Sequence, residues 1–333
     1  MQKGYRTWVF ENKPVIISTG TVGGPFEGEG LLADDFDLLH SDLWLQQDSY
    51  EKAHRVLLEE ACQKAMEKAS LQKEQIEFFL GGDLINQITP TSFACRTFGF
   101  PYFGLFGACS TSMEGLALGS YIVNTNGAKY ILTGASSHNT AVEKQFRYPN
   151  DYGAQKPPTA QWTVTGAGVA VLSNDGEGPK VTSATIGKVV DMGMTDPLNM
   201  GGAMAPAAVD TIEAHLHERN VDPSYYDLIV TGDLGQIGHE IALELFKKHG
   251  TPIFDNSFKD CGMMIYRDDQ PVLAGASGAG CSATVVYGHL LNQMRKGELN
   301  KILVAATGAL LSPLSFQQNE TIPCIAHAVS IEM

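Results

Sequence analysis

The sequence predicts a layered α/β protein built from two duplicated halves, stacked as α/β/α/β/α. Segments with helical periodicity alternate with short apolar runs, and this alternation favours a mostly parallel sheet covered by helices. A cysteine turn occurs twice, at Cys109-Ser110-Thr111 and at Cys281-Ser282-Ala283. Two apolar runs end in Gly-Asp-Leu, at Gly82-Asp83-Leu84 and at Gly232-Asp233-Leu234. Two independent matches in the same order make chance similarity a poor explanation.

In the first half the pattern reads helix, strand, linker, strand, cysteine turn, helix and strand. Asp48 and Glu51 form a capping box, which predicts that a helix begins there. The apolar run Phe78 to Leu80 predicts a strand, and the run Tyr102 to Phe106 predicts the next one. The helix-like segment Met113 to Val123 follows the cysteine turn. A strand then begins near Lys129.

The second half repeats this order. Pro206 suits a first helical position, and Val209, Ile212 and Leu216 then fall on one face of the predicted helix. The spacing from Cys281 to Lys301 equals that from Cys109 to Lys129. A turn cluster at 175–179 marks the end of the first half. We therefore place the N-terminal half, which carries Cys109, at 1–177 and the C-terminal half at 178–333.

Composition limits the classes of protein to which the chain can belong. Of 333 residues, 44% are hydrophobic and 18% charged, which is typical of a soluble globular protein. The net charge of −14 is distributed along the chain and argues against nucleic acid as a partner. No apolar run reaches the roughly 18 residues of a membrane span, and no apolar segment of a signal peptide follows the N-terminus. Six cysteines without paired spacing predict free thiols in the cytoplasm and no metal site.

Cys109 is placed where a cysteine can become a nucleophile. It lies at a break marked by Gly107, directly before a predicted helix. The exposed N–H groups and the positive end of the helix dipole favour a thiolate over a thiol. The alternative is a small, half-buried side chain that only packs at a tight turn.

The duplication and the cysteine turn together resemble the thiolase superfamily, which includes thiolases and ketoacyl-synthase condensing enzymes. Asp196-Pro197-Leu198-Asn199-Met200-Gly201, followed by Ala205-Pro206-Ala207, is similar to the D-P-x-x-M-G pattern of thiolases. Gly275-Ala276-Ser277-Gly278-Ala279 is similar to the end of their H-P-x-G-A-S-G-A motif. The resemblance spans nearly the whole chain. It implies the five-layered thiolase fold and a homodimer formed through the first halves.

The departures from this pattern argue against catalysis. Val272 stands at the position of the thiolase histidine, and Gly232 with Asp233 at that of the condensing-enzyme histidine. The second thiolase cysteine is missing, and Cys324 lies too far downstream to replace it. General acid–base help is typically worth ~10²–10⁴-fold and each oxyanion donor ~10²–10³-fold. We therefore expect no catalytic residues and no cofactor, with Cys109 as a vestigial nucleophile in a pocket that now binds a ligand.

More narrowly, the chain resembles a sporulation family of thiolase-like proteins from endospore-forming bacteria. That family is implicated in moving dipicolinic acid into the developing spore. The resemblance implies dipicolinic acid, with or without calcium, as the ligand and membrane-embedded proteins of the stage V sporulation A group as partners. It also implies peripheral association with the spore inner membrane through those partners. A cysteine-dependent acyltransferase and a non-binding scaffold subunit of a membrane transport assembly remain the alternatives.

The candidate ligand-binding residues follow from these motifs. An apolar slot for a flat ring is expected from Phe106, Met113 and Met200, and backbone N–H groups at the start of the Cys109 helix could bind a carboxylate. Two aspartates follow the ends of strands, where they either ligate calcium or only cap turns. Two histidines and a basic stretch also lie near these motifs. Such residues are more often solvated or hydrogen-bonded groups on the surface than ligand contacts. The candidates for ligand binding are Cys109, Asp83, Asp233, His138 and Met200; the ambiguous groups are His239, Lys144, Arg147 and Lys156.

Overall fold

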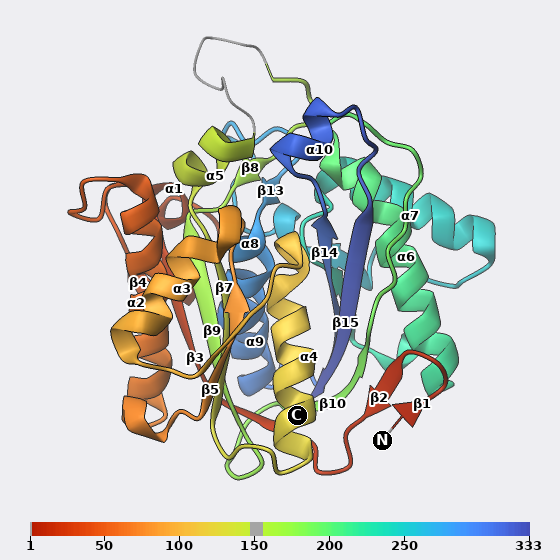
Figure 1. The fold of residues 1–333 in the computed structure, drawn as a ribbon. Coiled ribbons are helices and arrows are strands. Elements are labelled where there is room, and N and C mark those ends of the chain that lie inside the picture. Colours follow the sequence, from red (N-terminus) through yellow and green to blue (C-terminus); the bar gives the residue numbers. More distant parts are fainter. Residues whose placement is uncertain (1, 147–155) are drawn as a thin grey trace.

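The structure, a computed structural model, describes residues 2–146 and 156–333 and contains two five-stranded half-sheets (Figure 1). The first half contributes β3 (Val15–Gly23), β5 (Phe78–Gly82), β6 (Tyr102–Gly104), β7 (Ile131–Ser137) and β9 (Gly166–Ser173). The second half contributes β10 (Lys180–Thr185), β11 (Leu228–Thr231), β12 (Phe258–Asp260), β14 (Lys301–Ala309) and β15 (Cys324–Glu332).

The two half-sheets have the same topology, which confirms the duplication. Their strand orders are β6-β5-β7-β9-β3 and β12-β11-β14-β15-β10. In the first, β5 pairs in parallel with β6 and β7, whereas β9 pairs antiparallel with β7 and β3. The second half repeats these directions strand for strand. Four strands of each half therefore point one way, and the half-sheets join where Lys180 of β10 pairs with Val15 of β3.

The helices complete the predicted five layers. Contacts place α2 (Tyr50–Lys68) and α3 (Thr89–Phe98) on the outer face of the first half-sheet, and α6 (Met200–Arg219) and α7 (Gly235–His249) on that of the second (Figure 1). Between the half-sheets lie α4 (Thr111–Asn124), α8 (Ala279–Thr284), the π-helical segment η7 (Val285–Leu290) and α9 (Leu291–Arg295). Buried apolar side chains form three clusters, one at each of these helix layers. The hydrophobic effect therefore acts separately on the centre and on each outer face.

Short elements fill the connections, several of them at the end of the molecule where the parallel strands finish (Figure 1). These are α1 (Pro25–Gly28), β4 (Leu38–Leu39), α5 (Asn139–Phe146), β8 (Trp162–Thr163), β13 (Ala276–Ser277) and α10 (Pro313–Gln317). Single 3-10 turns are η1 (Ala33–Asp35), η2 (Lys73–Gln75), η3 (Asn86–Ile88), η4 (Ala108–Ser110), η5 (Pro223–Tyr225) and η6 (Cys261–Met263).

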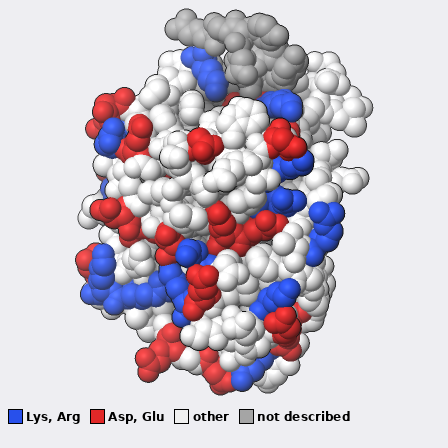
Figure 2. Space-filling view, turned by 90° about the vertical axis from the view of Figure 1, so that its left-hand side faces the viewer, with Lys and Arg blue, Asp and Glu red and all other residues white. Residues whose placement is uncertain are grey.

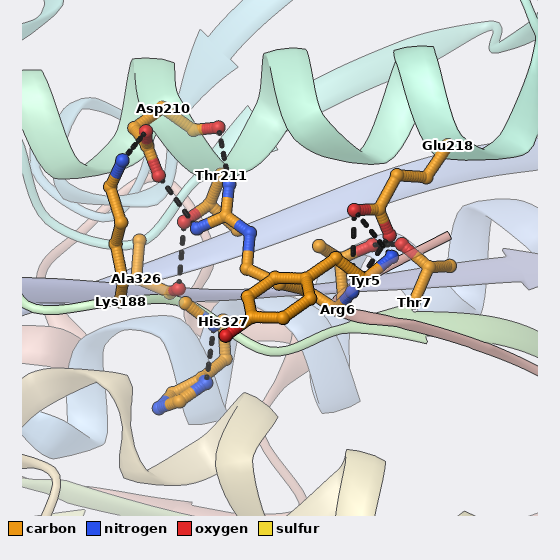
Figure 3. Close-up of polar contacts among 11 residues, drawn as sticks. Tyr5, Arg6, Thr7, Lys188, Asp210, Thr211, Glu218, Ala326 and His327 are labelled. Atoms are coloured by element: carbon orange, nitrogen blue, oxygen red, sulfur yellow. Dashed lines mark hydrogen bonds and ion pairs between the residues drawn. The ribbon is translucent and has the colours of Figure 1, made fainter. Parts of the chain in front are cut away.

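The N-terminal arm, formed by β1 (Gln2–Lys3) and β2 (Thr7–Val9), lies on the second half (Figure 3). Strand β2 pairs with β10. The backbone N–H groups of Tyr5 and Arg6 donate to the Glu218 carboxylate of α6. The Arg6 guanidinium lies 2.8 Å from Asp210, which also pairs with Lys188. The first residues of the chain are therefore anchored to a helix of the opposite half.

Two predicted helix starts are wrong. Helix α2 is capped by Ser49, whose hydroxyl accepts from the Lys52 N–H, while Asp48 pairs with the Lys52 ammonium instead. Helix α6 begins at Met200, with the Asn199 side chain as its cap, so Pro206 lies inside the helix. Serine and asparagine cap helices as well as aspartate does. At the start of α2 the sequence has Asp48 and Ser49 side by side, and either could be the cap. The predicted linkers between strands also contain a helix each, α3 and α7.

The negative charge is concentrated and not distributed evenly, which corrects the expectation from composition. Residues 27–77 contain 13 acidic and 5 basic side chains, a net charge of −8 out of −14. Figure 2 shows acidic side chains crossing the middle of the face on the α2 side. Across residues 2–146 and 156–333, no helix is both long and apolar enough to cross a membrane.

Candidate functional site: a pocket beside Cys109

A pocket of about 800 Å³ opens beside the start of α4, between α5, α10 and the first residue of α6. Its walls are mostly apolar, and among the described residues that line it none is charged or a histidine. They are Leu84, Asn86, Phe106, Ala108, Cys109, Val142, Gln145, Phe146, Thr163, Met200, Ser277, Ala309, Leu310, Leu311, Ser312, Pro313 and Leu314. Such a cavity suits a small ligand with an apolar body and a few polar atoms.

The local backbone delivers Cys109 to this pocket. Ala108 adopts a left-handed φ of 52°, which turns the chain sharply before the helical turns begin. Cys109 then lies in η4, directly before α4, and is 7% exposed. Its counterpart Cys281 lies in α8, is fully buried, and donates to the Gly232 carbonyl over 3.3 Å. As predicted, both cysteines lie at helix starts; Cys109 lines a pocket, whereas Cys281 is enclosed by the described residues around it.

Asp233 is the polar group behind this wall. It is buried, and its carboxylate accepts from the Thr307 hydroxyl over 2.8 Å, from the Ser277 hydroxyl over 3.2 Å and from the Gly278 N–H over 3.1 Å. Burial raises the pKa of Asp233 to about 6, whereas Cys109, Thr307 and the Gly278 N–H lower it. At neutral pH the side chain is therefore mostly a carboxylate.

Asp83, the counterpart of Asp233, has a capping role. Its carboxylate accepts from the Ile85 N–H over 2.8 Å, and from the Thr91 N–H and hydroxyl near the start of α3. Burial raises the pKa of Asp83 to about 6. It is not among the residues that line the pocket. The structure thus separates two aspartates that the sequence pattern treats alike.

The equivalent capping duty in the second half belongs to a different residue. Asp260, at the end of β12, accepts from the Leu234 N–H over 2.8 Å and from the Gly235 N–H over 2.9 Å. Those two N–H groups begin α7. Asp233 consequently does not bind the start of α7, and its oxygens accept from Ser277, Thr307 and the N–H of Gly278, which directly precedes α8.

Neither candidate histidine reaches the pocket. His138 is buried and its Nε2 lies 2.8 Å from the Leu43 carbonyl, while burial lowers its pKa to about 4. His239 stacks on Phe258 and lies 3.2 Å from the carbonyl oxygen of the same residue. Both fit the ordinary role of a hydrogen-bonded buried histidine.

The predicted apolar slot is partly wrong. Met200 and Phe106 line the pocket. Met113 instead is the third residue of α4, is fully buried, and packs in the central core between the half-sheets.

Val272 and Gly232, which stand at the histidine positions, supply no side chain that could move a proton. Val272 packs against the central core, and Gly232 offers only its carbonyl, which Cys281 occupies. Lys144 pairs with Glu51 over 3.2 Å and Lys156 with Glu143 over 3.4 Å. Arg147 lies outside the described residues. Cys324 is buried at the start of β15, and its thiol donates to the Ile322 carbonyl.

Sequence reasoning missed several polar residues of the pocket. Asn86 follows the end of β5, which is a signal it shares with Asp83, but Gln145 and Ser312 carry no pattern. The Gln145 side-chain oxygen accepts from the Asn86 N–H, so its amide N–H₂ group remains available as a donor. The hydroxyl protons of Thr163 and Ser277 are committed to Glu143 and Asp233. The amides of Asn86 and Gln145 are therefore the donor side chains of this wall.

A comparison with known protein families assigns the chain. The family model of Stage V sporulation protein AD (SpoVAD) matches residues 4–332. The chain belongs to the SpoVAD family. It is 48% identical over 329 residues to Stage V sporulation protein AD of Bacillus subtilis (strain 168), covering 99% of this chain and 97% of that one.

Solved structures show the fold of this SpoVAD-family chain. It is similar to 3-oxoacyl-[acyl-carrier-protein] synthase III from Aquifex aeolicus VF5, with a TM-score of 0.60 at 14% identity, over 96% of this chain and 100% of that one. It is also similar to human mitochondrial 3-ketoacyl-CoA thiolase, with a TM-score of 0.59 at 10% identity, over 96% and 98% of the two chains. The thiolase-like fold predicted from the duplicated motifs is confirmed.

Proposed function

We propose that this SpoVAD-family chain is a non-catalytic protein that binds dipicolinic acid, or its calcium chelate, for uptake into the developing spore. One observation carries the proposal. The pocket beside the former nucleophile position is kept, but among the described residues that line it there is no histidine and no charged side chain to act as a general base. A pocket with these walls can hold a ligand more readily than it can catalyse acyl transfer.

The chemistry of the walls matches the shape of dipicolinate, a flat aromatic ring with two carboxylates. Apolar side chains, among them Leu84, Phe106 and Phe146, offer faces for the ring. The amides of Asn86 and Gln145 can donate to one carboxylate. Backbone N–H groups at the start of the Cys109 helix are suited to the other.

Calcium has no protein carboxylate to ligate in this pocket. Both oxygens of Asp83 accept protein hydrogen bonds, and so do both oxygens of Asp233. Among the residues that the structure describes, no group of three or more His, Cys, Asp or Glu side chains could hold a metal ion. We therefore expect dipicolinate to bind with calcium and without it.

Calorimetric titration with dipicolinate, in the presence of calcium and again with a chelator, tests the proposal. Both conditions should give saturable binding to the parent protein. Asn86→Ala and Gln145→Ala should each weaken it roughly tenfold, since a hydrogen bond to a charged group contributes about 1.5–3 kcal/mol. Gln63→Ala, on the exposed side of α2, is the matched control and should leave the affinity unchanged.

Two further measurements separate the alternatives. Acetyl-coenzyme A should give no turnover with the parent protein, because the nucleophile lacks a base. Turnover that is lost in Cys109→Ala would favour the acyltransferase. If dipicolinate releases no heat in either condition and no turnover appears, the scaffold subunit becomes the better explanation. If the protein binds dipicolinate or acts as a scaffold, its proposed partners are the membrane-embedded stage V sporulation A proteins. Its proposed location is then the spore inner membrane.

A further inference from the structure

One wall of the pocket comes from a single stretch of chain between two paired strands. Strands β14 and β15 pair as far as Ala309 and Cys324, and the residues between them form a loop that contains α10. Residues 310–314 of this loop, all consecutive, line the pocket. The loop is therefore in a position to open or close the pocket.

The two ends of this loop are anchored, whereas its middle is not. The Leu310 N–H donates to the Pro323 carbonyl over 2.8 Å, and the Ile322 N–H donates to the Met194 carbonyl over 2.7 Å. Between these anchors, every hydrogen bond that residues 312–320 make within the described chain has both of its partners in that segment. No described helix or strand packs extensively against α10. The segment is thus a self-contained unit held mainly at its ends.

The equivalent connection in the first half is anchored. Strands β7 and β9 correspond to β14 and β15, and helix α5, which lies between them in sequence, lines the same pocket. The Asn139 N–H donates to the Thr165 hydroxyl over 3.0 Å, and the Asn139 amide to the Thr163 carbonyl over 3.2 Å. The Thr163 hydroxyl donates to Glu143 over 2.9 Å. Of two equivalent connections beside one pocket, α5 is therefore fixed and α10 can move.

The apolar side chains of α10 are exposed to water beside a pocket that is large for its proposed ligand. Leu314 is 63% exposed although it lines the pocket, and Phe316 is 50% exposed. Residues 310–319 include no charged side chain, so an inward movement brings no charge into the apolar cavity. Pockets of ~300–1,000 Å³ usually bury drug-sized ligands, and dipicolinate is smaller than these. Movement of α10 over the ring removes apolar surface from water.

We propose that residues 310–322 form a lid that closes over a ligand in the pocket, with α5 as the fixed wall. The inference deepens the proposed function and rests on its premise that the pocket binds a small ligand. In the structure the lid is open, since Leu314 and Phe316 are exposed. Closing rotates α10 about the two anchored ends of the loop and buries both side chains.

Amide hydrogen exchange, followed by mass spectrometry, tests whether the lid moves. In the free protein the amides of 316–320 should exchange at least ten times faster than those of 142–146 in α5. Dipicolinate at a saturating concentration, set by calorimetry, should slow the exchange of 316–320 at least tenfold. Equal protection of the two segments in the free protein would overturn the inference, and so would unchanged exchange at saturation.

Phe316→Ala separates lid closure from contacts in the open pocket, because Phe316 is not among the residues that line it. If closure buries this ring, the variant should bind dipicolinate roughly tenfold more weakly than the parent. Phe254→Ala is the matched control, since Phe254 is 66% exposed and does not line the pocket. It should keep the parental affinity. Parental affinity in Phe316→Ala would show that the lid does not close.

A covalent occupant keeps this test independent of dipicolinate. If dipicolinate releases no heat, the proposed function fails, but the lid can still be examined. Alkylation of Cys109, which lines the pocket, with N-benzyliodoacetamide attaches an aromatic ring there. Exchange of 316–320 should slow in the alkylated parent and not in Cys109→Ala treated in the same way. Exchange that is unchanged by the attached ring would overturn the inference.

Discussion

Glu27 is a second buried carboxylate, and it joins three segments near the pocket wall. Its Oε1 accepts from the Thr165 N–H over 3.0 Å and from the Tyr266 hydroxyl over 2.5 Å, whereas its buried Oε2 has no partner. Thr165 follows β8 and Tyr266 precedes β13, the two short strands that supply Thr163 and Ser277 to the pocket. Burial raises the pKa of Glu27 from 4.5 to about 7.

This shift predicts a pH dependence of stability. A carboxyl whose pKa is higher in the folded state stabilises the protein below its unfolded value, and that stability is lost as the pH rises from about 4.5 to 7. Glu27→Gln mimics the protonated form. Relative to the parent, the variant should therefore be about 2–3 kcal/mol more stable at pH 8 than at pH 5, that is, its free energy of unfolding should be higher by that amount. Urea unfolding of both proteins at the two pH values measures this, and an equal difference at both would contradict it.

The residue scale also shows where sequence reasoning reached its limit in the site. Asp83 and Asp233 have the same neighbours along the chain, and only tertiary contacts make one a cap of α3 and the other a partner of Ser277 and Thr307. Gln145 lines the pocket because α5 lies over it, and no local sequence pattern indicates this position. Cys109 and Met200 were predictable because they occupy motif positions of a known fold.

At the scale of elements, α6 and α7 approach each other closely at one glycine. A Cβ atom added to Gly201 would lie 2.0 Å from the Leu234 carbonyl oxygen. Gly201 is the second residue of α6, directly after the pocket residue Met200, and Leu234 precedes α7. The absence of a side chain at 201 therefore allows both helix starts to meet beside the pocket.

Gly201→Ala should destabilise the protein by about 1–3 kcal/mol, the usual cost of overpacking against a rigid neighbour. The added methyl group would meet the backbone carbonyl of Leu234, and a backbone atom cannot rotate away as a side chain can. Gly28→Ala provides the control, because the nearest atoms to an added Cβ there lie 3.6 Å away or more. Thermal unfolding of both variants should separate them clearly, and equal melting temperatures would show that α6 can shift at no cost.

Element boundaries were predicted less well than element types. The sequence placed the helices of both halves correctly in order, since their apolar faces repeat at helical spacing. It misplaced the start of α2 because the adjacent Asp48 and Ser49 compete for the cap. It misplaced the start of α6 because Pro206, which suits a first helical position, lies inside a helix that begins at Met200. Helices α3 and α7 were missed altogether.

At the scale of the molecule, the first half-sheet ends in a strand with an apolar, accessible edge. Strand β6 pairs with β5 on one side, and the described residues contain no partner for its other side. Phe103 of β6 is 50% exposed and Phe93 of α3 is 41% exposed. Exposed edges of this kind promote association between chains. These observations support the homodimer proposed from the resemblance to thiolases.

Sedimentation at micromolar concentration should give a dimer for the parent chain. Phe103→Asp places a charge at this edge and should give a monomer. Phe254→Asp is the matched control, because Phe254 is 66% exposed but belongs to the second half, and this variant should remain a dimer. A parent that sediments as a monomer, or a Phe103→Asp variant that stays dimeric, would place the interface elsewhere or remove it.

The transfer of helix capping from Asp233 to Asp260 has a consequence for how the two halves could diverge. A duplicated gene begins with two equal sets of parts, and a part can change its use only when another part takes over its work. In the first half Asp83 still secures its helix, so altering it would damage the framework. In the second half Asp260 secures the helix, so Asp233 could turn to other partners, and it now holds Ser277, Thr307 and the Gly278 N–H beside the pocket. The difference between the two halves at this wall is therefore an outcome of redundancy: the half with a second aspartate is the one in which a strand-end carboxylate was released from the helix start.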